Sequence, residues 1–162
     1  MSAPNSATAA AGPLSGLPDP DLDRRFYAGV PLRRLLAWMI DVAIVLVIGV
    51  PIAVLFGLLT LGFGFALFGF IIAAVGFVYR TSLLAGPASA TLGMRFTGIE
   101  FRRGNGERFD FTTALLHTAI YAVCIGTFVL QLLSCLTILG TRYRQSLADI
   151  ILGTTAINRP AD

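Results

Sequence analysis

The chain has 162 residues, of which 56% are hydrophobic and 13% are charged, and its formal net charge is +3. A water-soluble domain of this size could not bury so much apolar surface, so the composition predicts an integral membrane protein. No basic cluster is interleaved with aromatic residues, so we expect no nucleic-acid partner and attribute the positive charge to membrane topology.

The chain begins with a polar segment, residues 1–29, rich in Ala, Pro, Ser, Gly and Asp. It lacks the basic and apolar regions of a secretory signal, and its composition predicts a disordered tail. The first hydrophobic segment follows at about 32–59. Pro31 suits the start of a helix and Pro51 predicts a kink inside it.

A second hydrophobic segment runs from about 62 to 84, and both segments are long enough to cross a bilayer. Small residues recur on it at spacings of 4, 3, 4 and 3. Such a stripe lets another helix approach closely, and we expect it to contact the first helix. The stripe consists of Gly62, Ala66, Gly69, Ala73 and Gly76.

Residues 86–110 form a polar loop that contains four arginines. Gly104-Asn105-Gly106 lies between the short runs 99–102 and 108–111, and this pattern predicts a hairpin at the membrane surface. The polar N-terminal segment and this loop carry arginines, whereas the connection between the first two segments carries none. The positive-inside rule therefore predicts a cytoplasmic N-terminus. All twelve basic residues are Arg, which favours a bacterial source and hence a bacterial inner membrane.

The third hydrophobic segment, about 111–140, is longer than one span needs and shorter than two require. A single crossing would leave the arginines after it outside the cell. A re-entrant segment broken near 124–127 would keep them inside, and we favour it over the single crossing. The expected fold is all-α: a small helical bundle with two transmembrane helices, a third long or re-entrant hydrophobic segment and a hairpin-like cytoplasmic loop, within a membrane domain at 30–158 and before a short tail at 159–162.

Asp41 is the one charged residue between Leu35 and Tyr79. Arg34 lies two turns away, with about 10 Å of rise between them, so the two cannot form a simple pair within the helix. Arg80, one turn beyond Gly76, is the expected partner of Asp41. Asp149 would lie near Arg34 if the C-terminus is cytoplasmic, which predicts a second ion pair.

These charged residues admit two interpretations. A carboxylate inside the membrane could bind and release a proton or a cation. Alternatively, Asp41 and Asp149 could belong to an ion-pair network that only fixes the arrangement of the helices. His117 has the same two interpretations, as a proton carrier or as a hydrogen-bonding partner of Thr113 or Tyr121.

Three ordered motifs resemble the RDD family of bacterial membrane proteins, which is named for one arginine and two aspartates. The resemblance covers about 31–157 and implies that Arg34, Asp41 and Asp149 are the named triplet. Their charge and position make Arg80, His117 and Arg144 the expected supporting residues. Met94 and His117 depart from the family pattern, at positions where Lys and Arg are frequent. The first motif is Arg34, Ala37 and Asp41; the second is Thr91, Leu92, Gly93 and Gly98; the third is Arg142 or Arg144 with Gln145, Leu147, Asp149, Gly153 and Thr154.

The resemblance implies transport of a ligand or ion, with the triplet as the candidate ion or solute site. A chain this short would need a homo-oligomer or another membrane protein to form a complete transporter. The alternative is a structural or accessory membrane protein that scaffolds a complex. No HExxH, GxSxG, P-loop or Cys/His ligand motif occurs, so we expect no enzyme, no cofactor and no metal site. Cys124 and Cys135 are expected to be buried free thiols.

Overall fold

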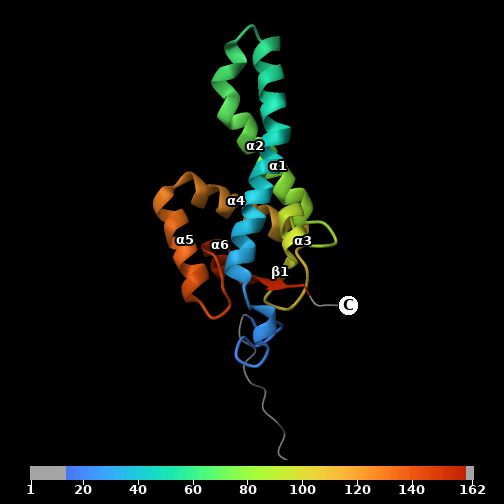
Figure 1. Cartoon of the computed structure of the whole chain (residues 1–162), viewed down its shortest axis with the longest axis vertical. Coiled ribbons are helices and arrows are strands. Elements are labelled where there is room, and N and C mark those ends of the chain that lie inside the picture. The colour runs from blue at the N-terminus through green and yellow to red at the C-terminus, as the bar shows by residue number, and fades with distance from the viewer. Residues whose placement is uncertain (1–13, 160–162) are drawn as a thin grey trace, which may run out of the picture.

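The structure is a computed structural model of the chain, and it describes residues 14–159. It is mostly helical, and a long helical hairpin projects from the remainder (Figure 1). One arm of the hairpin is α1 (Val30–Leu59), and the other is the short η2 (Phe63–Leu67) followed by α2 (Phe68–Leu84). Both arms are long and apolar enough to cross a membrane, as predicted. Pro31 lies in the first turn of α1, and the helix continues past Pro51.

The two arms pack differently from the prediction. At the Gly76 end of the small-residue stripe the helix approaches α1, where a Cβ would lie 3.4 Å from Val45. A Cβ on Gly69 would have no atom within 4 Å, so the predicted continuous stripe is wrong. The close approach instead uses α1 glycines: the ring of Phe65 occupies the space in which a Cβ of Gly57 would stand.

The third hydrophobic segment is a bent pair of helices, α4 (Phe111–Gly126) and α5 (Phe128–Gly140). The two helices meet at Thr127 and are bent by 117°, and the bend falls inside the predicted break. If this pair counts as one span, the described chain has three candidate spans, and otherwise it has two.

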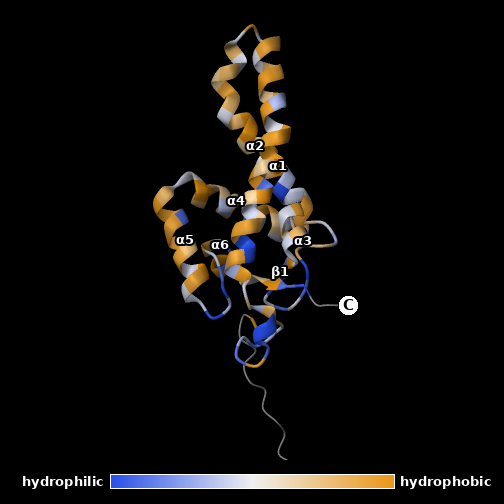
Figure 2. Cartoon of the chain, in the orientation of Figure 1, coloured by the Kyte–Doolittle hydropathy of each residue, from blue (hydrophilic) through white to orange (hydrophobic). Residues whose placement is uncertain are grey.

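At the end opposite the hairpin tip, the chain forms a small mixed unit that we call the base. It comprises α3 (Leu92–Thr97), β1 (Ile99–Arg103), α6 (Leu147–Leu152) and β2 (Thr154–Asn158). Hydrophilic residues gather in this part of the molecule, while the hairpin is almost entirely apolar (Figure 2).

The predicted hairpin around Asn105 is wrong in its pairing. The turn forms, because the Arg103 N–H donates to the Glu107 carbonyl over 2.8 Å and Gly106 has φ of +83°. However, β1 pairs antiparallel with β2, which lies more than 50 positions later, and Ile99 is opposite Asn158. The sheet therefore joins the polar loop to the C-terminal segment.

The N-terminal segment also joins the base, so the prediction of a disordered tail is wrong for residues 14–29. The Gly16 N–H donates to the Gly104 carbonyl over 2.8 Å, and the Tyr27 hydroxyl donates to the Pro18 carbonyl over 2.9 Å. A short 3-10 helix, η1 (Arg24–Phe26), leads into α1. The remainder of the predicted tail, residues 1–13, lies outside the described residues, as do residues 160–162 of the predicted C-terminal tail.

The length of α1 indicates where the polar groups lie relative to the bilayer. The uncharged stretch from Val42 to Leu59 is about 27 Å long at the rise of an α-helix. This nearly equals the thickness of a hydrocarbon core, about 30 Å. With the hairpin inserted, Asp41 therefore lies near the edge of the hydrocarbon on the side of the base.

Candidate functional site

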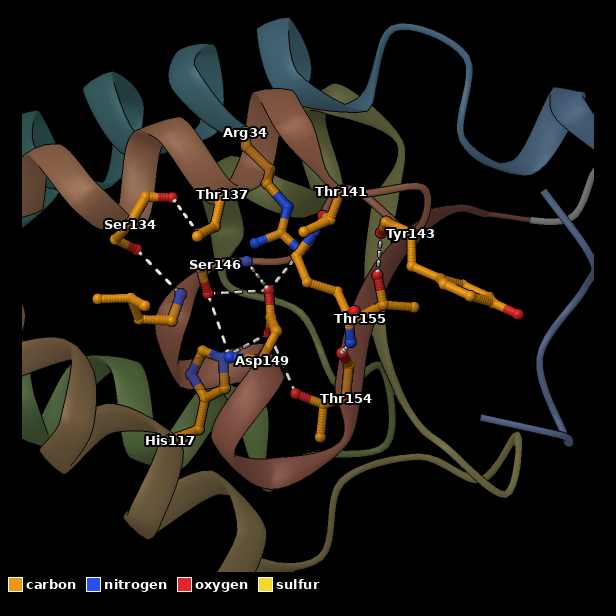
Figure 3. Close-up of polar contacts among 12 residues, drawn as sticks. Arg34, His117, Ser134, Thr137, Thr141, Tyr143, Ser146, Asp149, Thr154 and Thr155 are labelled. Atoms are coloured by element: carbon orange, nitrogen blue, oxygen red, sulfur yellow. Dashed lines mark hydrogen bonds and ion pairs between the residues drawn. The ribbon is translucent and has the colours of Figure 1, made fainter. Parts of the chain in front are cut away.

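Asp149 is the centre of a buried cluster that joins three helices (Figure 3). Arg34 Nη2 on α1 lies 2.7 Å from Asp149 Oδ2, and His117 Nε2 on α4 lies 2.9 Å from Asp149 Oδ1. The predicted ion pair between Arg34 and Asp149 is confirmed. His117 bonds to neither of its expected partners, because its ring faces α6 rather than a residue of its own helix.

The oxygens of Asp149 accept further hydrogen bonds from nearby groups in the chain. The backbone N–H and the hydroxyl of Ser146 each donate to Oδ2 over 2.9 Å. The Asp149 N–H in turn donates to the Ser146 hydroxyl oxygen over 3.3 Å, which completes a capping box at the start of α6. The Thr154 hydroxyl donates to Oδ1 over 3.1 Å. Since Asp149 is fully buried, these bonds replace the water that an ionised carboxylate would otherwise bind.

The charge state of Asp149 follows from these contacts. Burial by itself would raise the pKa of this carboxyl, but the Arg34 guanidinium, the bond from His117 and the Ser146 N–H together lower the pKa below its ordinary value. Asp149 therefore remains ionised at neutral pH.

Asp41 lies in a second cluster, between α1, α2 and α3. The hydroxyls of Tyr79 and Thr91 donate to its two oxygens over 2.6 Å each, and the Gly93 N–H donates to Oδ1 over 2.8 Å. The Tyr79 hydroxyl also accepts the Leu92 N–H over 3.2 Å. Asp41 thus holds the start of α3 against the transmembrane hairpin.

Arg80 forms no ion pair with Asp41 or with any other carboxylate in the described part of the chain, so the predicted pair is wrong. Successive residues of a helix point about 100° apart, and on α2 it is Tyr79 that faces Asp41. Arg80 turns toward α4, where its guanidinium carbon lies 4.2 Å from the centre of the Tyr121 ring. Trp38 Nε1 donates to the hydroxyl of the same ring over 2.9 Å.

Arg144 does not reach either aspartate. Its backbone lies in the left-handed region, with φ of +53°, and its side chain donates to the carbonyl of Leu139 at the end of α5. Arg144 therefore belongs to the connection between α5 and α6 and lies outside both clusters.

A cavity of about 460 Å³, which we call the main cavity, lies among the helices. Polar or ionisable side chains reach it from several elements, and both clusters border it. These side chains are Arg34, Asp41, Arg80, His117, Tyr121, Gln131, Ser134 and Ser146, with the thiols of Cys124 and Cys135. Both thiols are free, but Cys135 is exposed, so the expectation of burial is wrong for that residue.

Three nitrogen atoms beside the main cavity are buried without a hydrogen-bond partner: Nε of Arg34, Nε of Arg80 and Nδ1 of His117. They come from α1, α2 and α4. Buried polar atoms in proteins normally have a hydrogen-bond partner, which is often a buried water, so these three nitrogens mark positions where a further polar group would be favourable. Within residues 14–159, no group of three His, Cys, Asp or Glu residues is arranged to hold a metal.

Sequence reasoning missed Tyr79, Tyr121 and Ser146 as site residues. A signal for Ser146 was present: a serine three positions before an acidic residue and at the start of an apolar run is typical of a capping box. No comparable signal identifies Tyr121.

The small residues of the motifs have clear structural reasons. Gly98 and Gly153 end α3 and α6 with φ of +72° and +61°, a conformation that side chains disfavour. A Cβ on Gly93 would lie 2.2 Å from the carbonyl oxygen of Ala37. Gln145 donates to the Thr154 carbonyl over 2.6 Å and so connects α6 with β2.

Comparison with known proteins gave one match. The model of the RDD family matches residues 27–153, which include the first two motifs and all of the third except its last residue, Thr154. A search of curated proteins gave no match, and neither did a search of solved structures.

Proposed function

The chain belongs to the RDD family of membrane proteins, and we propose that it binds an ion or small polar solute in the main cavity and moves it, or helps to move it, across the membrane. The observation that carries this proposal is the set of three buried nitrogens of Arg34, Arg80 and His117 without partners. The cavity volume of about 460 Å³ is in the range of small-molecule sites, which is roughly 300–1,000 Å³.

In this proposal the two aspartates of the signature support the cavity and do not bind the solute. Asp41 accepts three hydrogen bonds, and Asp149 is bonded by Arg34, His117, Ser146 and Thr154. A transported cation would have to break these bonds to reach either carboxylate. The solute would instead contact polar side chains that line the cavity, among them Arg34, His117 and Gln131.

The bent pair α4–α5 is proposed to enter the membrane and return to the same side. The pairing of β1 with β2 and the contact of Gly16 with Gly104 support this arrangement, because they bring the N-terminal segment, the polar loop and the C-terminal segment together. The membrane is proposed to be a bacterial inner membrane, with the base in the cytoplasm.

Alkaline phosphatase fusions test this topology, because the enzyme is active only outside the cytoplasm. We expect a fusion after Leu61, at the hairpin tip, to be active and a fusion after Asp162 to be inactive. A fusion of a cytoplasm-active reporter at each position serves as the control, with the reverse pattern expected. An active phosphatase after Asp162 would contradict the re-entrant arrangement.

A complete pathway would need more protein than one copy of this chain supplies. We propose a homo-oligomer or another membrane protein as the partner. No enzymatic activity is proposed.

The exposed thiol of Cys135 provides a direct test of the main cavity. In the Cys124→Ala variant, we expect a charged, water-soluble methanethiosulfonate reagent to modify Cys135, because a cavity that admits a polar solute also admits water. The matched control moves the thiol by one position, to Leu136→Cys in a chain without the other two cysteines. Leu136 is 64% exposed but does not line the cavity, so it should face lipid and react slowly.

Flux measurements complete this test. Proteoliposomes with the Cys124→Ala variant are placed under Na⁺, K⁺ and pH gradients, before and after modification. We expect flux above that of protein-free liposomes, and its loss on modification at position 135 but not at position 136. Equal reaction at the two positions would contradict a water-filled cavity, and absence of flux in every gradient would contradict transport.

One observation favours a second candidate function, that of a structural or accessory membrane protein. Each signature aspartate has a full set of hydrogen-bond donors and fixes one part of the base to the transmembrane helices. A protein that retains its fold and its native partners, but shows no flux and no reagent access at Cys135, would support this candidate.

A further inference from the structure

A second hollow, which we call the side groove, lies between α1, α2 and α4 and has a volume of about 390 Å³. Most of its wall is apolar and belongs to the transmembrane hairpin. The residues of the hairpin that line this wall include Val42, Val45, Leu46, Ile72 and Phe77. Its composition suits a hydrocarbon chain, whereas a hydrated ion would find almost no polar partners along it.

The side groove has one polar end, formed by Asp41, Arg80, Tyr121 and Trp38. Arg80 is the cation there, and no carboxylate of the described chain lies within ion-pairing distance of it. Its Nε is buried without a partner, and its guanidinium rests on the Tyr121 ring. Asp41 is already engaged by its three donors. An arginine held in this way presents its remaining N–H groups to an anion. The planar guanidinium group of arginine commonly binds phosphate groups in proteins.

Depth favours a lipid as the source of that anion. On α1 the uncharged stretch ends at Asp41, and on α2 it ends at Arg80, so both residues lie where the hydrocarbon ends. The phosphates of the adjacent leaflet lie at this level. A lipid with its phosphate at Arg80 would have its acyl chain beside the apolar wall of the groove, which belongs to the apolar hairpin in Figure 2.

We propose that the side groove binds an anionic phospholipid, with its phosphate on Arg80 and one acyl chain between α1, α2 and α4. A zwitterionic lipid also carries a phosphate, but its quaternary amine would add a cation beside Arg80. A net negative headgroup is therefore selected. This proposal does not depend on solute transport, because Arg80 lines both hollows, whereas Arg34 and His117 line the main cavity and not the side groove.

Trp38 allows a direct test, because it is the one tryptophan of the chain and lines the side groove. The full-length protein is reconstituted in phosphatidylcholine vesicles, and increasing fractions of lipid with brominated acyl chains are added. Brominated phosphatidylglycerol and brominated phosphatidylcholine are compared as quenchers of Trp38 fluorescence. We expect the anionic lipid to quench at about fivefold lower mole fraction. The reason is that the attraction between one basic side chain and anionic lipid corresponds to about a fivefold difference in affinity.

The Arg80→Gln variant should lose this preference, and Arg80→Lys should retain part of it. Arg142→Gln is the matched control: this arginine is 65% exposed and pairs with Asp21 in the base, so the preference should be unchanged. The comparison of the two lipids in the wild-type protein needs no variant, so the proposal can be tested even if Arg80→Gln does not fold.

Several results would overturn the proposal. Equal quenching by the two lipids would show that the groove does not select charge, and a preference that persists in Arg80→Gln would place selection elsewhere. Loss of the preference on adding inorganic phosphate would assign the anion to a soluble source. Absence of quenching by either lipid would show that protein, such as a second copy of the chain, covers the groove.

Discussion

Replacement of Asp149 by Asn is expected to lower the free energy of unfolding by about 3 kcal/mol, the cost of removing one member of a buried ion pair. The substitution preserves size but removes the charge opposite Arg34, whose side chain is only 13% exposed. It also places an N–H₂ group among donors from Arg34, Ser146 and Thr154. Unfolding of the purified protein in one detergent, followed by Trp38 fluorescence, measures the loss.

Asp21→Asn is the matched control for this substitution. Asp21 pairs with Arg142, and both side chains are 65% exposed, so water replaces the lost contact and the expected change is below about 1 kcal/mol. A loss in Asp149→Asn no larger than in Asp21→Asn would show that the cluster does not stabilise the fold.

The stability difference between the wild type and Asp149→Asn should also depend on pH. Because the pKa of folded Asp149 lies below its ordinary value, the stabilisation is fully present above the unfolded pKa of about 3.9. It is lost as the pH falls from there through the folded pKa. The stability difference between wild type and Asp149→Asn should therefore be constant near neutral pH and shrink in acid. A difference that shrinks as the pH rises from neutral would contradict the assignment.

The contact between Arg34 and Asp149 could be predicted from the sequence, and the residue of α2 that contacts Asp41 could not. The first follows from depth alone: opposite charges at the same edge of the membrane pair because each would otherwise remain unsatisfied. The second depends on the rotation of α2 about its own axis. Apolar residues surround this helix on all sides, so hydropathy contains no information about which face meets α1, and Tyr79 occupies the position assigned to Arg80.

The long-range sheet was missed for a related reason. The run 99–102 was correctly expected to be extended, but the local Asn-Gly turn suggested a neighbouring partner. The true partner, β2, follows Gly153, which ends α6, and contains the β-branched residues Thr154, Thr155 and Ile157. That combination of a helix stop and β-branched residues predicts a strand. Its pairing with β1 still could not be derived, because nothing in either run specifies a partner.

The motifs are better explained by the structure than by their order in the sequence. Arg34 and Asp41 lie seven residues apart on one helix, yet they bind different parts of the base. Arg34 holds α6 through Asp149, and Asp41 holds α3 through Thr91 and Gly93. The signature therefore describes two attachments of the base to one transmembrane helix, with the main cavity between them.

The second attachment can be tested at Gly93. A methyl group there would lie 2.2 Å from the Ala37 carbonyl oxygen and 2.9 Å from Asp41 Oδ1. The Ala37 oxygen is a backbone atom of α1 and cannot move by a side-chain rotation. Gly93→Ala must therefore push α3 away from α1. We expect this to lengthen the bonds from Thr91 and the Gly93 N–H to Asp41, and to cost about 3 kcal/mol, the upper end for overpacking.

Gly69→Ala in α2 is the matched control, because a Cβ there would meet no atom within 4 Å. This substitution should be neutral or stabilise the helix slightly, since alanine favours helix over glycine by up to about 1 kcal/mol. Hydrogen exchange supplies a local readout: Gly93→Ala should accelerate exchange in α3, whereas Gly69→Ala should not. If Gly93→Ala were as stable and as protected in α3 as the wild type, the close contact of α3 with Ala37 and Asp41 would not be what attaches the base to α1. The signature aspartate in α1 would then be free for a direct role in the cavity that it borders.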